Sequence, residues 1–160
     1  MRNILFLLLI LFGINSPVFS QLVNPGIERL SKDADIILTG KVVHQKSNWN
    51  KDHSRIYTDV TVEINECLKG NANNAIVIKN PGGEVGEVGE LYSHMPTFKN
   101  DEEVLLFVKK DREKDAFKVL DGAEGKVTLI KDLKTGEMMT SSKEKISSLK
   151  KDIKTYLIDK

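Results

Sequence analysis

The stretch from Arg55 to Lys69 constrains the fold more than any other part of this 160-residue chain. Between Ile56 and Asn65, residues such as Ile, Val and Thr alternate with more polar ones. This period of two, built mainly from β-branched residues, predicts a strand with one buried and one solvent-facing side. The turn residues 70–74 and the apolar run 75–78 that follow predict a second strand. The chain is therefore expected to be a β protein whose other segments pair with this hairpin.

The segment before this hairpin predicts another long strand, from Ala34 to His44. Gly40 lies inside it and indicates a bend or a bulge, as a small barrel needs at its corners. Residues 46–54 are polar and rich in turn formers, so we expect a loop there. Trp49 lies in the middle of this predicted loop. It either folds back over the mouth of the barrel or contacts a partner.

The segment after the hairpin is rich in glycine over residues 80–90, which disfavours both a regular helix and a long strand. Residues 91–98 form an apolar patch broken by Pro96, and we expect them to pack irregularly against the barrel. Residues 101–110 are apolar at successive positions, which predicts a strand buried on both faces, with a helix or a loop over the outer one. Shorter strands are expected at 116–120 and 126–130.

Two helices are predicted, one near each end of the chain. Asn24 and Pro25 are favoured at a helix start, and this short helix is expected to end near residues 32–33. The second helix is expected to begin at Ser141 or Ser142, where Ser141 and Glu144 have the spacing of a capping box. Its apolar stripe is formed by Ile146, Leu149, Ile153 and Leu157.

The first 20 residues have the pattern of a signal peptide: Arg2, a short apolar run, and small residues before Gln21. Cleavage would leave a secreted or periplasmic protein that begins at Gln21 and has no stable membrane anchor. The alternative is that this segment anchors the chain in a membrane. The predicted organisation is a signal peptide (1–20), an OB-like β-barrel domain (21–133), and a C-terminal turn with an amphipathic helix (134–160).

The charge balance of the chain argues against nucleic acid as a partner. Arg2 is the only charged residue of the first 20, so the rest carries 23 basic and 23 acidic side chains. Nucleic acids and anionic lipids are bound by surfaces with an excess of Lys and Arg. The single cysteine, Cys67, cannot form an internal disulfide, and we expect it to be a small buried apolar residue.

No catalytic or cofactor motif is recognised in the sequence, so we predict neither enzymatic activity nor a cofactor. The histidines are not spaced like zinc ligands. Residues 48–54 resemble a calcium loop only loosely, because the sixth position is His53 and not Gly. The glycines at 82–89 alternate with glutamates, which would repel phosphate. The three glutamates, Glu84, Glu87 and Glu90, could instead form an acidic ridge.

Three segments together resemble a family of bacterial exported domains of unassigned activity: IYTDVTVEINECLKG (56–70), residues 80–110, and VLDGAEGKVTLI (119–130). Such domains look like small OB-type barrels, similar in architecture to the tissue inhibitors of metalloproteinases and to netrin-like modules. The resemblance implies an accessory or binding role. Those inhibitors bind zinc through an N-terminal cysteine, whereas the expected mature chain begins with Gln21, so that mechanism is not carried over.

The sequence thus predicts a small, mainly β, antiparallel OB-like barrel of five or six strands, with a short N-terminal helix and a C-terminal helix. The favoured function is a non-catalytic exported domain that contacts a protein or peptide through barrel loops. One alternative is an inhibitor or regulator of a secreted peptidase. A second is a metal-dependent hydrolase with ligands among His44, His53, His94 and Asp52. The candidate binding residues are Trp49, Tyr92, His94, Met95 and Phe98.

Overall fold

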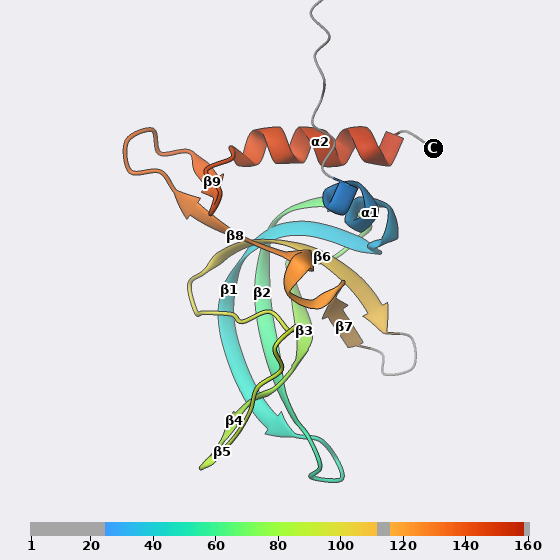
Figure 1. Cartoon of the computed structure of the whole chain (residues 1–160), viewed down its shortest axis with the longest axis vertical. Coiled ribbons are helices and arrows are strands. Elements are labelled where there is room, and N and C mark those ends of the chain that lie inside the picture. Colours follow the sequence, from blue (N-terminus) through green and yellow to red (C-terminus); the bar gives the residue numbers. More distant parts are fainter. Residues whose placement is uncertain (1–24, 112–115, 159–160) are drawn as a thin grey trace, which may run out of the picture.

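The chain is mainly β, with a helix near each end (Figure 1). The structure is a computed structural model and describes residues 25–111 and 116–158. The helices are α1 (Pro25–Asp33) and α2 (Ile146–Ile158), and η1 (Gly122–Gly125) is a single 3-10 turn. The strands are β1 (Ile36–Trp49), β2 (Ile56–Lys69), β3 (Ala75–Pro81), β4 (Gly83–Val85), β5 (Val88–Glu90), β6 (Glu103–Asp111), β7 (Ala116–Val119), β8 (Lys126–Lys131) and β9 (Met138–Thr140).

Five strands form a closed ring, in the order β1-β2-β3-β7-β6 and back to β1. The long strand β1 pairs antiparallel with β2 on one edge and with β6 on the other. Among the strands that the structure describes, β3 and β7 form the only parallel pair, and its register contains a single residue pair, Ile78 with Phe117. The ring is therefore least strongly joined between β3 and β7. Strand β8, which the sequence predicted, pairs with β6 outside the ring.

The interior of the ring is filled by the alternating residues of β2. Ile56, Val60 and Val62 are fully buried, which confirms the predicted inward face of this strand. Val60 and Val62 belong to the inner cluster, and their partners in it come from all the other ring strands. Gly40 lies where the pairing of β1 with β2 shifts by one residue, so the predicted bulge is confirmed.

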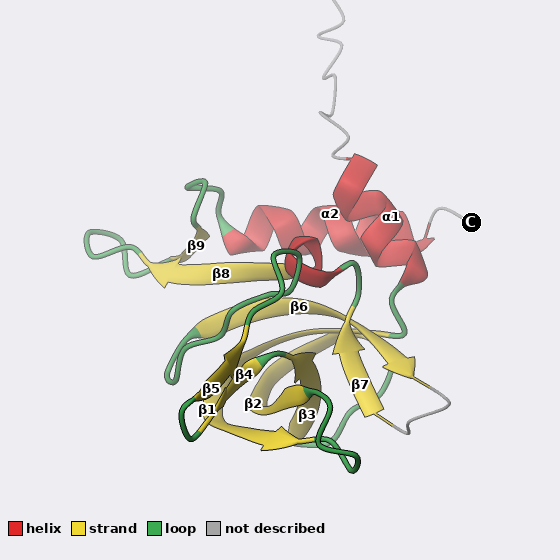
Figure 2. Cartoon of the chain, turned by 60° about the horizontal axis from the view of Figure 1, so that its bottom comes forward, coloured by secondary structure: helices red, strands yellow, loops and turns green. Residues whose placement is uncertain are grey.

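Strand β6 is buried on both faces, as its sequence predicted. Val104, Leu106 and Val108 belong to the cluster inside the ring, whereas Leu105 and Phe107 belong to a second cluster outside it. The helices α1 and α2 lie next to each other over this outer face (Figure 2). The two helices therefore cover the apolar side of β6 that the ring leaves exposed.

The predicted apolar stripe of α2 packs within the same chain. Leu149 and Ile153 are buried in the outer cluster, and Ile146 and Leu157 are partly buried against it. The predicted helix start was wrong, because α2 begins at Ile146.

The turn before α2 explains its later start. The backbone N–H of Thr140 donates to the carbonyl of Glu144, and the hydroxyl of Thr140 accepts from the Glu144 N–H at 3.1 Å. Lys143 has a positive φ of 66° in this turn, which a helix does not allow. Strand β9, which pairs with β8, had no counterpart in the sequence prediction.

Two further predictions were wrong. Residues 46–49 are not part of a loop, since β1 continues to Trp49 and pairs there with Ile56. The polar residues 46–48 fit in this strand because their own side chains are exposed or only partly buried, although the paired start of β2 is buried. Cys67 is exposed and not buried, because the second half of β2 leaves the core.

The predicted signal peptide and the start at Gln21 lie outside the described residues. None of the helices in the described part is long and apolar enough to span a membrane.

Two lysines from the sheet bind the C-terminal end of α1. Lys69 Nζ donates to the carbonyl oxygens of Ser31 and Lys32, each at 2.8 Å, and Lys109 Nζ donates to that of Asp33 at 2.7 Å. The last carbonyls of a helix lack intrahelical donors and carry partial negative charge, so these cations stabilise the helix end.

We expect Lys69→Met to lower the free energy of unfolding by about 1–2 kcal/mol, because it removes two charge-assisted hydrogen bonds and keeps the apolar stem. Urea unfolding measures this loss. The control is Lys51→Met, since Lys51 is exposed in the turn after β1. Equal stabilities of the two variants would contradict the assignment.

Candidate functional site

An open groove of about 790 Å³ lies beside the hairpin formed by β4 and β5. Its lining comes from β1, β2, the end of β3, the hairpin, and the irregular segment 91–98. Three of the candidate binding residues line it together: Tyr92, Met95 and Phe98. Each of the three is partly exposed, so each is accessible from the groove. The segment that the sequence predicted to pack irregularly is therefore one wall of this groove.

The β4–β5 hairpin is built by its glycines. Gly86 has a φ of +63° at the first position of the two-residue turn, which is the requirement of a type II′ turn. Gly83 lies against β1 and β2, where an added side chain would overlap the hydroxyl groups of Ser47 and Thr58. These two hydroxyls are 2.9 Å apart, and Thr58 also donates to the carbonyl of Gly82 at 2.7 Å. The hairpin thus stays close to the long strands because glycine presents no side chain there.

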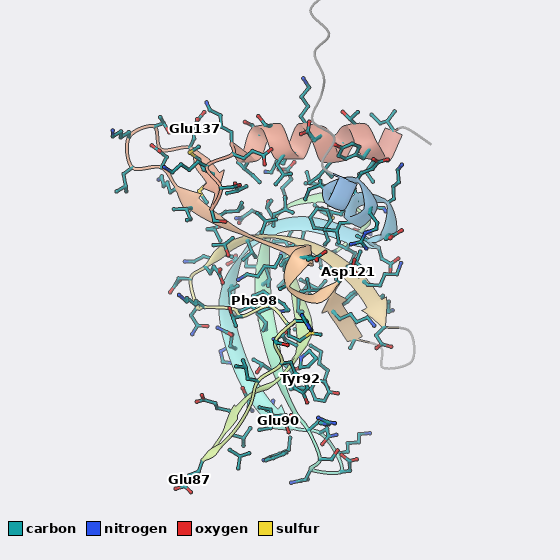
Figure 3. The ribbon with its side chains drawn as sticks, in the orientation of Figure 1. Glu87, Glu90, Tyr92, Phe98, Asp121 and Glu137 are labelled. Atoms are coloured by element: carbon teal, nitrogen blue, oxygen red, sulfur yellow. The ribbon has the colours of Figure 1, made fainter. Side chains whose placement is uncertain are left out.

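Tyr92 is fixed by a polar network at the start of the irregular wall. Its hydroxyl accepts from Arg55 at 2.8 Å and donates to the carboxylate of Glu90 at 3.0 Å. The same carboxylate oxygen accepts the backbone N–H of Ile56 at 3.1 Å. Glu90 and Tyr92 lie next to each other in Figure 3. This network ties the wall of the groove to the beginning of β2, and it raises the pKa of Arg55 through the hydrogen bond to Tyr92.

Phe98 is fixed at the other end of the wall by Lys126. The ammonium of Lys126 lies 4.9 Å from the centre of the Phe98 ring and donates to the carbonyl of Thr97 at 2.5 Å and to Glu102 at 2.7 Å. The side chains of Lys126 and Glu102 are 9% and 13% exposed, so this ion pair is nearly buried.

The carboxylate of Glu102 also accepts from the Thr128 hydroxyl at 2.7 Å and from the backbone N–H of Lys99 at 3.0 Å. Burial alone would raise the pKa of Glu102, but the hydrogen bonds from Lys126, Thr128 and Lys99 outweigh it and hold the pKa below its ordinary value. Both ends of the wall are therefore fixed before any ligand arrives, which lowers the entropic cost of binding.

The remaining candidate residues do not line the groove. The side chain of His94 is exposed, and its backbone carbonyl accepts the N–H of Ala123 at 2.9 Å. Trp49 lies at the end of β1 and stacks on His53, with ring centres 6.2 Å apart and planes 9° from parallel. Trp49 is partly buried and belongs to the tip of the β1–β2 pair.

The four candidate metal ligands come from three places: His44 from β1, His53 and Asp52 from the turn after it, and His94 from the irregular segment. Within residues 25–111 and 116–158, no three His, Cys, Asp or Glu side chains are grouped so that they could hold a metal ion. Asp52 instead accepts hydrogen bonds from the hydroxyl and the N–H of Ser54, which lower its pKa.

Among the described residues that line the groove there are acidic side chains but no basic ones. Glu84 and Glu90 line it, and Glu87 lies at the free end of the hairpin (Figure 3). Glu90 is engaged by Tyr92 and Ile56. Glu84 and Glu87 are exposed and form no ion pair with the described part of the chain.

Sequence reasoning missed the floor of the groove, formed by Ser47 of β1 and Thr58 of β2. These residues meet because the strand register pairs them directly. The paired glycines 82 and 83 were the available signal, since such a pair indicates a close approach of the backbone to another segment.

No protein-family model matches the chain, and a search of curated proteins likewise returns no match.

Proposed function

We propose that the closed ring is a small OB-like barrel. The support is its connectivity: five strands in the order β1-β2-β3-β7-β6 close on β1, and one pair is parallel and nearly open. An OB-fold is a five-stranded, partly open Greek-key barrel, and its loops and one face commonly bind extended ligands. Because a fold does not determine function, the functional proposal rests on the groove.

We propose that the protein is an exported, non-catalytic binding domain that holds an extended segment of a protein or peptide in the groove beside β4 and β5. The observation that carries this proposal is the fixed wall: Tyr92 and Phe98 are partly exposed to the groove and are each anchored by a polar network. Binding energy at peptide sites is concentrated in a few apolar and aromatic side chains of this kind.

The shape and chemistry of the groove favour an extended chain. It is open along its length and mixes apolar groups, such as Met95 and Leu91, with the hydroxyls of Ser47 and Thr58. Small-molecule sites are usually enclosed and mainly apolar, whereas peptide grooves expose one side of the ligand to solvent.

The test is selection from a displayed random dodecapeptide library on the immobilised protein. We expect enriched peptides to bind the wild type at least about tenfold more tightly than the variant Leu91→Ser/Met95→Ser, since both changes remove apolar contact area. The control is Leu133→Ser, because Leu133 is 99% exposed and lies outside the groove. Unfolding curves show whether the variants remain folded. If no enriched peptide binds Leu91→Ser/Met95→Ser more weakly than the wild type, the proposal is overturned.

A further inference from the structure

We infer, on the basis of the proposed function, that the bound segment pairs with β5 as an added strand and carries basic side chains next to Glu84 and Glu87. Three observations on the hairpin carry this inference: a strand edge that no described strand pairs with, exposed apolar side chains along it, and two carboxylates with no partner among the described residues.

The first observation is the edge of β5. In the described part of the chain β5 pairs with β4 alone, through Gly83–Glu90, Glu84–Gly89 and Val85–Val88. A two-residue turn makes Val85 and Val88 a hydrogen-bonded pair, and the bonds of an antiparallel ladder alternate. The N–H and C=O of Gly89 therefore point away from β4. Such free groups are the template on which an extended peptide adds a strand.

The second observation is the apolar character of this edge. Val88 is 48% exposed and Leu91 is 88% exposed, whereas Gly89 between them has no side chain. Gly89 and Leu91 both line the groove, so a chain paired with β5 would lie in it. Because Gly89 leaves its backbone uncovered, a partner backbone can approach to hydrogen-bond distance.

The third observation is the charge of the hairpin. Glu84, Glu87 and Glu90 are its only charged residues, and two of them are unpaired within the described chain. Arg55, which lies nearby, donates to Tyr92. A partner with Lys or Arg would neutralise Glu84 and Glu87, whereas an acidic partner would be repelled.

The experiment uses the peptides enriched from the dodecapeptide library. We expect an excess of Lys and Arg at alternate positions, since alternate side chains of an added strand face the same way. A synthetic peptide of the most enriched sequence is then measured by fluorescence polarisation against the wild type and against Glu84→Lys/Glu87→Lys. We expect the variant to bind about tenfold more weakly, because two exposed charge attractions are replaced by repulsions.

The matched control is Glu144→Lys, which changes an exposed glutamate in the turn before α2, away from the hairpin. It should alter affinity less than about twofold. A second measurement tests the strand pairing: methylating the backbone nitrogens of alternate peptide residues should abolish binding for one of the two alternate sets and leave the other set almost unaffected.

The outcomes separate the two proposals. The inference would be overturned, and the proposed function left standing, by either of two results. The enriched peptides could depend on Leu91 and Met95 without an excess of Lys and Arg, or the peptide could still bind after methylation of either alternate set of its backbone nitrogens. If no peptide depends on the groove, both proposals fail. Loss of binding in both the charge-reversed variant and one methylated set would support the inference.

Discussion

Replacing Lys126 by methionine is expected to lower the free energy of unfolding at neutral pH by about 3 kcal/mol, because it leaves the carboxylate of Glu102 nearly buried without its cation. The substitution also removes the hydrogen bond to Thr97 and the contact with the Phe98 ring. Urea unfolding measures the loss, with Lys131→Met as control, since Lys131 is exposed on the same strand.

The pH dependence identifies Glu102 as the cause. Because its pKa is lowered in the folded protein, its contribution to stability is present above the ordinary glutamate pKa of about 4.3 and is lost as the pH falls through the lower folded value. In Lys126→Met the carboxyl can fold in its neutral form at low pH. The stability difference between wild type and variant should therefore shrink between about pH 7 and pH 3.

A double variant completes this test. Adding Glu102→Leu to Lys126→Met removes the unpaired charge and should recover part of the lost stability, because an apolar pair can replace a buried ion pair. A constant stability difference across the pH range, with no recovery in the double variant, would mean that Lys126 acts through packing alone.

The second large effect is expected at Gly40. A Cβ atom there would overlap the carbonyl oxygen of Glu63 and lie 2.8 Å from Cγ1 of Val62. β1 is held at this point by β2 and by β6, so neither neighbour can move without opening the ring. We expect Gly40→Ala to cost about 3 kcal/mol, at the upper end of the range for overpacking.

The matched control is Gly89→Ala. A Cβ atom added at position 89 would lie 3.4 Å from Cγ of Glu84, which is an ordinary van der Waals contact. It should change stability by less than about 0.5 kcal/mol. Thermal and urea unfolding of both variants decide the question. Equal effects at the two glycines would show that chain flexibility, and not the close approach of the strands, is what glycine provides at position 40.

Much of the fold follows from local patterns in the sequence. The alternation in β2 predicts one buried face and the continuous apolar run in β6 predicts two, and the structure confirms both predictions. The stripe of α2 is confirmed in the same way, although its start was not, because a local turn around Thr140 replaced the predicted cap. Local patterns record burial well because the hydrophobic effect acts on each side chain with the period of its element.

The candidate site followed from the sequence only in part. The apolar character of residues 91–98 pointed to Tyr92, Met95 and Phe98, which line one groove. Trp49 was predicted as a loop residue, and only the strand pairing shows that it belongs to β1 and stacks on His53.

The sequence by itself determined the β class, the order of the main strands, the two-sided burial of β6 and the presence of two helices. Tertiary structure alone decided that Ser47 meets Thr58, that Lys126 joins Phe98 to Glu102, and that Cys67 is exposed. The physical reason is that the polarity of each side chain largely decides whether that side chain is buried. The register and the contacts between distant segments depend instead on how all the strands close together, which no short stretch of the chain encodes.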